Sequence, residues 1–397
     1  MNGKQIHVAL FTPWGKDPHG RGWRWGAPIV RWGPPGIAKT ARWRQTAKQY
    51  GLPAYVLSPG ARGEGAFGVT PFPVQRDDGT TEMTFPAPSW CREIEPRGLL
   101  FIDEMGSIAN ILQPPMMEAL LERQIGGHYL TPTVRVVGAG NPTEMAADGM
   151  DLSMTNANRA VHMDEDNVAL NDFLAYFYGD GGDDGDVAKP LDAEAEEKRV
   201  LATWPTHYSW ARGLVGGFLT KLPQMRLQVP AEGAPERSRG WASPRSIESA
   251  ARLLASCRLH GASESETDEF LVGAVGTAWT VTFRAWANAQ DLPDAADLLD
   301  GKVKWEPSAA RLDRTAAVLG ACVSLVAPAD APRREERAVR VWQLFEACVD
   351  DAADVVFPNA VAMTRARLAK FAASGKVRVK IQPMLAAAGI TVESAGR

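Results

Sequence analysis

Short apolar runs, several of them rich in β-branched residues, alternate with helical or turn-rich stretches between residues 27 and 165. This alternation is typical of a parallel sheet covered by helices, because each strand must be followed by a crossover before the next parallel strand. The predicted fold class is therefore α/β with a five-stranded parallel sheet. The five predicted strands are PIVRW (28–32), AYVLS (54–58), GLLFI (98–102), VRVVGAG (134–140) and AVHM (160–163).

Two hairpins are predicted as insertions between these strands. The stretch 71–85, PFPVQRDDGTTEMTF, contains Asp78-Gly79, a pair that suits a tight turn. The stretch 123–130, RQIGGHYL, turns at its two consecutive glycines. No tandem repeat is visible along the chain.

Apolar positions in the second half of the chain follow helical spacing instead. The stretch 243–261 predicts a helix with Ser243 as its cap, and 266–286 continues the pattern. The run 316–327 is shorter than the roughly 20 residues that a membrane helix needs, so we predict a buried helix there. Apolar residues that share helix faces are Ile247, Ala250, Leu254 and Cys257, and, near the end, Val339, Trp342, Phe345 and Val349.

A stretch rich in Gly and Asp separates these two halves. It begins at residue 178 as YGDGGDDGDVAKPLDAEAEEK, and this composition disfavours regular structure. Its acidic residues lack the spacing of a calcium loop, so we predict a solvated acidic linker over 179–198.

Length and charge narrow the classes of function. With 397 residues, 45% of them hydrophobic, the chain can bury a sizeable core, and the length suggests two or three domains. A net charge of −4 gives no electrostatic reason to expect nucleic acid or an acidic membrane as the main partner. The first residues, MNGKQIHVALF, have neither a signal-type apolar core nor a cationic leader.

Cysteine usage points to the cytoplasm. The four cysteines lie far apart, with no C-x-x-C spacing and no nearby histidine cluster, so neither a zinc site nor a disulfide framework is predicted. Reduced thiols fit a cytoplasmic protein. The cysteines are Cys91, Cys257, Cys322 and Cys348.

The segment WGPPGIAKT at 32–40 nearly matches the phosphate-binding loop G-x-x-x-x-G-K-[ST]. It follows a predicted strand and opens a predicted helix, so backbone N–H groups and the helix N-terminus would together form an anion cradle. Lys39 is expected to reach the β- and γ-phosphates of a nucleotide, and the Thr40 hydroxyl to bind Mg²⁺. The predicted nucleotide-binding residues are Gly33, Pro34, Pro35, Gly36, Ile37, Ala38, Lys39 and Thr40.

Ala38 replaces the last glycine of that motif. We expect it to begin the helix with right-handed backbone angles, where alanine has no conformational handicap. Glycine is then needed only where the loop turns, at Gly33 and Gly36.

The run GLLFIDEM at 98–105 predicts a buried strand that delivers two carboxylates at its carboxyl end, where open α/β sheets bind ligands. Asp103 can hold the metal, and Glu104 can polarise the attacking water for in-line displacement. Taken alone, the pair could also be surface acids at the end of a strand.

Three further polar residues follow in order. Asn141 ends the strand of VRVVGAGNP, where its amide can bond the lytic water and the γ-phosphate, or simply start a turn. Arg159 precedes a short strand, and Arg245 lies in the first turn of a helix. Each arginine alone could be an ordinary surface residue.

This ordered set of motifs resembles the AAA+ ATPases and, within them, the MoxR-like group. The segments that carry the likeness, within residues 26–300, are GPPGIAKT, GLLFIDEM, VVGAGNP, LSMTNANRAVHMD, ASPRS and MMEALLERQIGGHYLTPTVRVVGAGNP. The resemblance implies an α/β P-loop NTPase core, a helical lid, and a ring, commonly a hexamer, with ATP bound between neighbours. Alanine at the position of Ala38 is frequent in that group.

Carried over residue by residue, the resemblance makes Asn141 sensor 1, Arg159 the arginine finger for the next subunit's ATP, and Arg245 the sensor 2 arginine of the lid. This sequence has NRA where related sequences often have NRF. A finger arginine contributes about 10³ to 10⁵ in rate, so an isolated subunit should hydrolyse ATP slowly.

The predicted organisation has four segments. They are a nucleotide-binding core with two hairpin insertions at 1–178, the acidic linker at 179–198, an α-helical lid at 199–305 and a helical C-terminal extension at 306–397.

The function these observations favour is that of a cytoplasmic ATPase, an ATP phosphohydrolase using ATP and Mg²⁺, which assembles as a ring and remodels or assembles a partner protein as a chaperone. MoxR-like relatives commonly work with proteins that carry a von Willebrand factor A domain, so the resemblance implies such a partner. No membrane partner is expected, nor any metal other than Mg²⁺.

Two alternatives stay open. A nucleic-acid-directed motor or loader could use the basic stretch 365–380, RARLAKFAASGKVRVK, although it holds one aromatic residue, Phe371, for stacking. A nucleotide-gated binding switch would not need the carboxylate of Glu104.

Aromatic residues and histidine complete the list of candidates. Trp14, Trp23 and Trp25 precede the first strand, where packing against the core is favoured over contact with an adenine. His162, on the strand after Arg159, is expected to be a satisfied core or interface residue.

Overall fold

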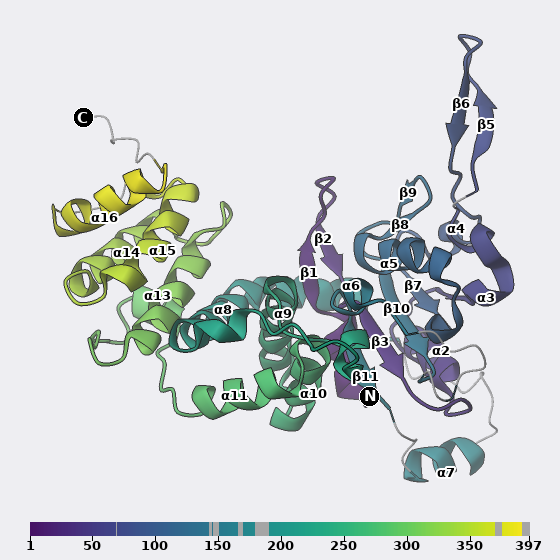
Figure 1. Cartoon of the computed structure of the whole chain (residues 1–397), viewed down its shortest axis with the longest axis horizontal. Coiled ribbons are helices and arrows are strands. Elements are labelled where there is room, and N and C mark those ends of the chain that lie inside the picture. The colour runs from purple at the N-terminus through teal and green to yellow at the C-terminus, as the bar shows by residue number, and fades with distance from the viewer. Residues whose placement is uncertain are drawn as a thin grey trace. The chain divides into compact units, whose positions relative to one another are not determined.

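The computed structural model describes residues 1–68, 70–142, 145, 151–165, 170–178, 190–369 and 375–390 (Figure 1). The chain forms two compact units. The first unit comprises residues 1–201, 229–253 and 260–276, and the second comprises 202–228, 254–259 and 277–397. No helix in the described ranges is both long enough and apolar enough to cross a bilayer.

A five-stranded sheet lies at the centre of the first unit, and its neighbouring strands are parallel throughout. All five predicted strands are confirmed, each within one residue at either end. In spatial order they are β11 (Val161–Asp164), β3 (Ile29–Trp32), β10 (Arg135–Gly140), β7 (Leu99–Ile102) and β4 (Ala54–Leu57). Strands β3, β7 and β10 are buried along their whole length, which explains their nearly continuous apolar sequences.

The strand order decides which loops meet. Strand β3 pairs with β10, and β10 pairs with β7, so the carboxyl ends of these three strands are adjacent. In the pairing register, Gly140 lies opposite Trp32, and Gly138 lies opposite Ile102. The residues that follow these strands therefore gather at one edge of the sheet, as expected for parallel strands.

Helices accompany the sheet, and the main ones are α2 (Lys39–Gln49) and α5 (Gln113–Glu122). Core residues come from both strands and helices, including Val30, Leu100 and Met116. Gly138 has no room for a side chain, because a Cβ there would lie 2.0 Å from the sulfur of Met105. Shorter helices of this unit are α3 (Pro59–Arg62), α4 (Cys91–Ile94), α6 (Met154–Ala157) and α7 (Leu170–Tyr178).

Both predicted hairpins are confirmed. Strands β5 (Phe72–Gln75) and β6 (Thr81–Thr84) pair antiparallel, with Gly79 at φ 81° in the turn. This hairpin projects from the rest of the first unit (Figure 1). Strands β8 (Gln124–Ile125) and β9 (His128–Tyr129) form the second hairpin.

The N-terminal segment contains structure that the sequence pattern did not predict. Helix α1 (Gly3–Leu10) is closed at its start by a capping box from Asn2, and a further hairpin follows it. That hairpin pairs β1 (Pro13–Lys16) with β2 (Trp23–Trp25). Trp25 is buried, as expected for packing against the core, whereas Trp14 and Trp23 are half-buried.

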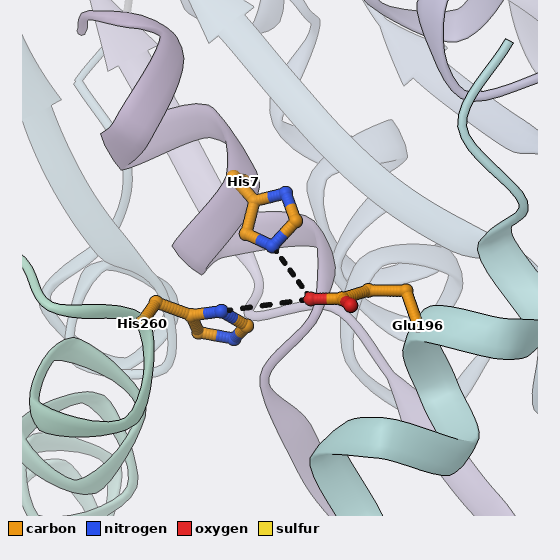
Figure 2. Close-up of side chains that lie close together, drawn as sticks. All are labelled: His7, Glu196 and His260. Atoms are coloured by element: carbon orange, nitrogen blue, oxygen red, sulfur yellow. Dashed lines mark hydrogen bonds and ion pairs between the residues drawn. The ribbon is translucent and has the colours of Figure 1, made fainter.

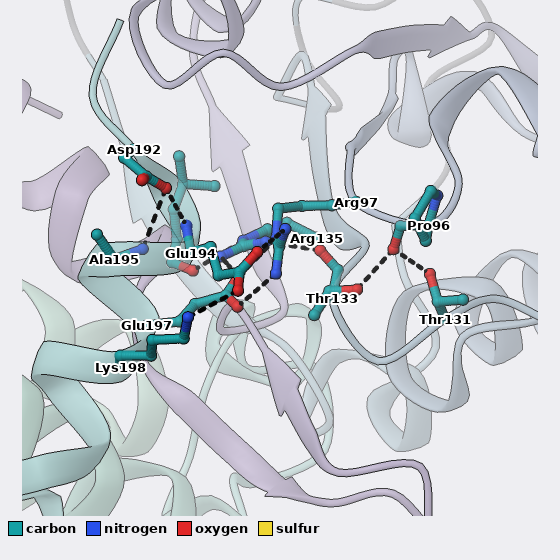
Figure 3. A network of polar contacts seen from close by, with 11 residues as sticks. Pro96, Arg97, Thr131, Thr133, Arg135, Asp192, Glu194, Ala195, Glu197 and Lys198 are labelled. Carbon is teal, nitrogen blue, oxygen red and sulfur yellow. Dashed lines mark hydrogen bonds and ion pairs between the residues drawn. The ribbon is translucent and has the colours of Figure 1, made fainter.

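The start of helix α8 (Ala193–Lys221) differs from the predicted acidic linker at 179–198. Residues 179–189 lie outside the described ranges, but 193–198 are helical. Glu197 is buried and accepts a 2.6 Å hydrogen bond from Nη2 of Arg135, and Arg97 reaches both Glu197 and Glu194 at 3.2 Å (Figure 3). The expectation of a solvated linker is therefore wrong for 193–198, because these acidic residues neutralise arginines of the first unit.

The second half of the chain is helical, as predicted. Ser243 caps α9 by accepting from the backbone N–H of Ser246 at 3.3 Å. The predicted helix over 266–286 is interrupted at Gly276, whose φ is 84°. The helices are α9 (Pro244–His260), α10 (Glu264–Val275), α11 (Thr277–Ala287), α12 (Ala295–Leu299), α13 (Leu312–Val326), α14 (Arg334–Cys348), α15 (Ala353–Arg365) and α16 (Gly375–Ala387).

Helices α12 to α16 enclose one apolar core in the second unit. The predicted buried run at 316–327 forms most of α13, and Trp342, Phe345 and Val349 of the predicted apolar face are buried. Val339 of that face is only half-buried. All four cysteines are buried and free.

Candidate nucleotide-binding site

The predicted phosphate loop connects β3 to α2 at the carboxyl edge of the sheet. Gly36 has φ 85°, a backbone conformation that favours glycine, as predicted. Gly33 is needed for a different reason, since a Cβ there would lie 2.4 Å from the carbonyl oxygen of Glu165. The loop requires one glycine for its turn and the other for close packing against the chain after β11.

The expectation for Ala38 is wrong. Ala38 is the N-cap of α2 and has left-handed angles, φ 59° and ψ 31°, instead of right-handed ones. This conformation costs an L-residue other than glycine about 1–2 kcal/mol. The loop has to reverse direction immediately before the helix, and this demand of the loop overrides the ordinary preference of alanine.

Lys39 lies folded into the loop. Its Nζ donates hydrogen bonds of 2.9 Å to the carbonyls of Gly33 and Pro34 and to Oδ1 of Asn141. Desolvation by burial, with a smaller effect from Arg31, lowers the pKa of Lys39, while Asp103 acts in the opposite direction. The ammonium group of Lys39 is thus hydrogen-bonded to three neutral oxygens, and none of these neutralises its charge. A bound phosphate could do so.

Thr40 and Asp103 meet directly, since the Thr40 hydroxyl donates to Oδ2 of Asp103 at 2.5 Å. A hydroxyl and a carboxylate are oxygen ligands of the kind that Mg²⁺ prefers, and their adjacency fits an ion bound between them and a nucleotide. The other oxygen, Oδ1 of Asp103, accepts from the backbone N–H of Glu104 at 2.9 Å.

Glu104 is exposed and has left-handed backbone angles, with φ 58°. Among the described residues its carboxylate has no hydrogen-bond or ion-pair partner. A carboxylate next to Asp103 in the chain and open to solvent is available to a water molecule, which suits a general base.

Asn141 lies directly after β10, as predicted. It accepts a hydrogen bond from Lys39, which links the end of β10 to the predicted phosphate loop, and Thr40 links the same loop to Asp103. The structure therefore brings Lys39, Thr40, Asp103 and Asn141 together through hydrogen bonds. We call these four residues the loop cluster.

Arg159 does not join the loop cluster. It comes two residues before β11, at the amino end of the parallel strands, whereas the loop lies at their carboxyl end. The four residues of β11 span about 13 Å and separate the backbone of Arg159 from the carboxyl end of the strands, where its own loop lies. Its Nε atom is buried without a hydrogen-bond partner among the described residues.

Arg245 is exposed in the first turn of α9. The start of this helix is bound to the segment that carries Arg159, because the Ser243 hydroxyl donates to Oδ1 of Asn158 at 2.6 Å. Asn158 also donates to the carbonyl of Trp241 at 2.6 Å. The segments that carry the two predicted catalytic arginines are therefore in contact, and within the described part of the chain neither arginine hydrogen-bonds a residue of the loop cluster.

His162 is a satisfied core residue, as expected. Trp32 Nε1 donates to its Nδ1 at 2.9 Å, and its Nε2 lies 2.8 Å from the carbonyl of Ala157, so the ring is neutral with the proton on Nε2. Burial lowers the pKa of His162 to about 4. The ring stacks on Trp32, the last residue before the loop, and so supports that end of β3.

The first unit also contains a buried ion network that the sequence pattern did not predict. Arg31 of β3 and Arg42 of α2 both pair with Glu165, which directly follows β11. Burial lowers the pKa of Arg31 to about 9. The charged residue inside the apolar strand PIVRW was the available signal, because a buried arginine requires a buried acceptor.

A hollow of about 360 Å³ opens beside the end of β3. The guanidinium of Arg239 lies 4.6 Å from the centre of the Trp32 ring and within 3.6 Å of Asp164. The lining residues are Trp32, Pro142, Asp151, Pro235, Glu236, Ser238 and Arg239. The hollow thus adjoins both the phosphate loop and the residue that follows Asn141.

Comparison with solved structures finds chains of similar fold. No known protein family matches the chain, and no curated protein is similar to it. The crystal structure of a Cytophaga hutchinsonii protein, provisionally named as an ATPase, is similar over 68% of this chain and 79% of its own, with 14% identity and a TM-score of 0.43. At that level the likeness carries no argument about function, which has to come from the site itself.

Proposed function

We propose that this protein is an Mg²⁺-dependent ATPase of the AAA+ class and of its MoxR-like group. The observation that carries the proposal is the loop cluster, where Lys39, Thr40, Asp103 and Asn141 converge from three adjacent strand ends. Each side chain has the chemistry expected of its position: an ammonium for phosphate oxygens, a hydroxyl and a carboxylate for Mg²⁺, and an amide for the lytic water.

In this proposal each residue of the site has a defined task. Lys39 would exchange its bonds to loop carbonyls for bonds to phosphate oxygens. Thr40 and Asp103 would hold Mg²⁺, whose chemical contribution would be to neutralise charge on the phosphates. Asn141 orients the water, and Glu104 accepts its proton. Backbone N–H groups from Gly36 to Thr40 supply further donors at the start of α2.

The placement of Arg159 supports hydrolysis between subunits. Arg159 precedes β11, at the opposite end of the strands from its own loop, and Ser243, two residues before Arg245, bonds the neighbouring Asn158. We propose that both arginines act on the nucleotide of a neighbouring subunit in a ring, commonly a hexamer in the AAA+ class, and that the cytoplasmic assembly remodels a client protein or a partner with a von Willebrand factor A domain.

The basic stretch at 365–380 gives little support to the nucleic-acid alternative. Lys376 and Lys380 of α16 both pair with Asp350, at 2.8 and 2.7 Å, so part of its positive charge is already neutralised. Phe371, its one aromatic residue, lies outside the described residues.

ATP turnover by wild-type protein and by Glu104→Gln tests the proposal. We expect hydrolysis to fall by about 10²- to 10⁴-fold in Glu104→Gln while ATP binding persists, because only the proton acceptor is lost. Lys39→Ala should lose both activities, and Glu93→Gln, which changes an exposed glutamate of α4, should lose neither. Normal turnover in Glu104→Gln would contradict the assignment, and binding without turnover in the wild type would favour a nucleotide-gated switch.

The ring and the partner are tested separately. Light scattering of Glu104→Gln with ATP should show a ring, because blocked hydrolysis keeps ATP between subunits, and affinity capture in this state should retain the client. A monomer under these conditions would contradict the ring. Stimulation of turnover by DNA, with a steep salt dependence, would favour the motor.

A further inference from the structure

Three residues of the first unit, each from a different helix, direct one potential metal ligand to a common point (Figure 2). His7 comes from α1, Glu196 from the first turn of α8 and His260 from the last residue of α9. Nε2 of His7 lies 2.8 Å from Oε1 of Glu196, and Nδ1 of His260 lies 3.7 Å from the same oxygen. We call these three residues the histidine cluster.

The spacing of the ligand atoms suits a small divalent ion. One ligand atom from each residue lies within 4.8 Å of the other two. Ligands of Zn²⁺ lie about 2.0–2.2 Å from the ion, so tetrahedral ligands are about 3.3–3.6 Å apart. The histidine cluster needs only side-chain adjustments of about 1 Å to reach this geometry.

The surroundings keep the ligands in place. The side chain of His260 is 2% exposed, whereas those of His7 and Glu196 are about one-fifth exposed, so the cluster is buried on one side and accessible on the other. Nδ1 of His7 lies 2.7 Å from the hydroxyl of Tyr50, which can donate to that nitrogen or accept from it. His7 can therefore keep this contact when Nε2 gives up its proton to bind a metal, as outer-shell partners of metal-binding histidines do.

The ionisation states at neutral pH are those that metal ligands require. Burial lowers the pKa of His7, and it lowers the pKa of His260 to about 3, so both rings are neutral. Hydrogen bonds from Arg199, opposed by burial and assisted by His7, lower the pKa of Glu196 to about 2. The cluster thus offers two neutral imidazoles and one carboxylate.

Arg199 occupies the same space with its own positive charge. Its Nη2 lies 2.6 Å from Oε1 of Glu196 and 3.3 Å from Nδ1 of His260, so this nitrogen contacts two of the three ligand atoms. The side chain is 53% exposed and can turn into solvent without leaving a buried charge behind. The positive charge of Arg199 would prevent weakly binding cations from occupying the site. Only an ion that binds both imidazoles strongly could displace the guanidinium.

We propose that His7, Glu196 and His260 form a binding site for one Zn²⁺ ion per chain, in competition with the guanidinium of Arg199. Two imidazoles and a carboxylate select zinc over Mg²⁺, which prefers oxygen ligands. A bound ion would tie α1 to α8 and to the end of α9. This site is separate from the loop cluster and does not depend on the proposed ATPase function.

The test is a titration of metal-free, full-length protein with Zn²⁺ against a chromophoric chelator, without nucleotide. We expect one ion per chain, and Co²⁺ in its place should give visible absorption bands whose intensity indicates four-coordinate geometry. Glu196→Gln and His260→Gln should weaken binding by more than about 10- to 100-fold, the range for losing an outer-shell partner alone. Wild-type protein that binds no Zn²⁺ would overturn the proposal.

Arg199→Gln shows whether weaker binding in the other variants reflects lost Zn²⁺ ligands or misfolding. The proposal predicts that this variant binds Zn²⁺ more tightly. Removing the competing charge should raise the Zn²⁺ affinity by about 10-fold or more, and a misfolded protein would not show such a gain. His128→Gln is the matched control, since His128 forms a similar pair with Glu95 at 2.9 Å but has no third ligand among the described residues. Unchanged or weaker binding in Arg199→Gln, or equal losses in His128→Gln, would overturn the proposal.

Discussion

The loop cluster and the histidine cluster are two polar sites in the same unit, but they are assembled in different ways. The loop cluster takes its residues from the ends of adjacent parallel strands, and each residue belongs to a short motif that can be recognised alone. The histidine cluster takes single residues from three helices, and His7 is 189 positions from Glu196. No local pattern surrounds any of its members.

The two sites also differ in whether the polar groups of one chain are enough to pair their charged side chains. In the loop cluster, Lys39 is held by neutral oxygens, and Glu104 has no partner among the described residues. In the histidine cluster, carboxylate, imidazoles and the arginine already balance one another. We therefore expect the first site to need a nucleotide and a neighbouring subunit, and the second to function within a single chain. The following experiments test that difference.

The largest effect is expected for Arg159→Ala. If Arg159 completes the site of a neighbour, turnover should fall by about 10³- to 10⁵-fold while ATP affinity is kept. Arg44→Ala, on the exposed face of α2, is the control and should be active. Mixing Arg159→Ala with Glu104→Gln subunits should restore part of the activity, because some interfaces then combine an intact loop cluster with an intact arginine. Full activity of Arg159→Ala alone would show that one chain suffices.

Acid unfolding tests the buried ring of His162, which packs against Trp32 at the end of β3. The folded-state pKa of His162 is about 4 and lies below the unfolded value of about 6.5, so the folded state favours the neutral ring. Its contribution is complete above pH 6.5 and is lost as the pH falls towards 4, by about 3 kcal/mol.

His162→Gln should reduce that loss, because an amide can still accept from Trp32 and donate to Ala157 without taking up a proton. The measurement is urea unfolding of metal-free protein between pH 7 and pH 4, with the surface variant His19→Gln as control. The slope that remains should come from the other groups whose pKa is lowered by burial, which include His7, His207, His260 and the N-terminal amine. An unchanged pH dependence in His162→Gln would show that this ring titrates normally.

Ligand-induced stabilisation should separate the two sites. At about 100 times its dissociation constant, a ligand stabilises the folded state by about 2.7 kcal/mol. Lys39→Ala should lose the stabilisation by Mg²⁺ and ATP but keep that by Zn²⁺, and Glu196→Gln should do the opposite. Thermal unfolding with each ligand measures both. If either variant lost both responses, the sites would not be independent.

The smallest effect is expected at Ala38. Because its backbone is left-handed, Ala38→Gly should stabilise the protein by about 1 kcal/mol, and Ala38→Val should destabilise it and weaken nucleotide binding. Ala41→Gly, inside α2, is the control and should cost about 0.5–1 kcal/mol. Denaturant unfolding and nucleotide titration measure these effects. A loss of stability in Ala38→Gly would show that the position is right-handed, as the sequence had suggested.

Much of the fold was predictable because its signals are local. Each buried strand is a continuous apolar run, and the turns carry glycine where φ is positive, as at Gly79. The order of polar residues after the strands indicated the loop cluster, because parallel strands place their carboxyl ends at one edge. Helix α1 was not predicted, since most of its short sequence is buried against tertiary partners that no local pattern reveals.

The sequence by itself determined the five strands, the two insertions, the helical second half and the chemical identity of the loop cluster, because spacing and residue type decide these locally. The tertiary structure alone decided the left-handed backbone of Ala38, the burial of Glu197 and the meeting of His7, Glu196 and His260. These features depend on loop closure and on contacts between helices that are distant in the sequence. Such contacts join residues whose spacing along the chain does not predict that they will meet.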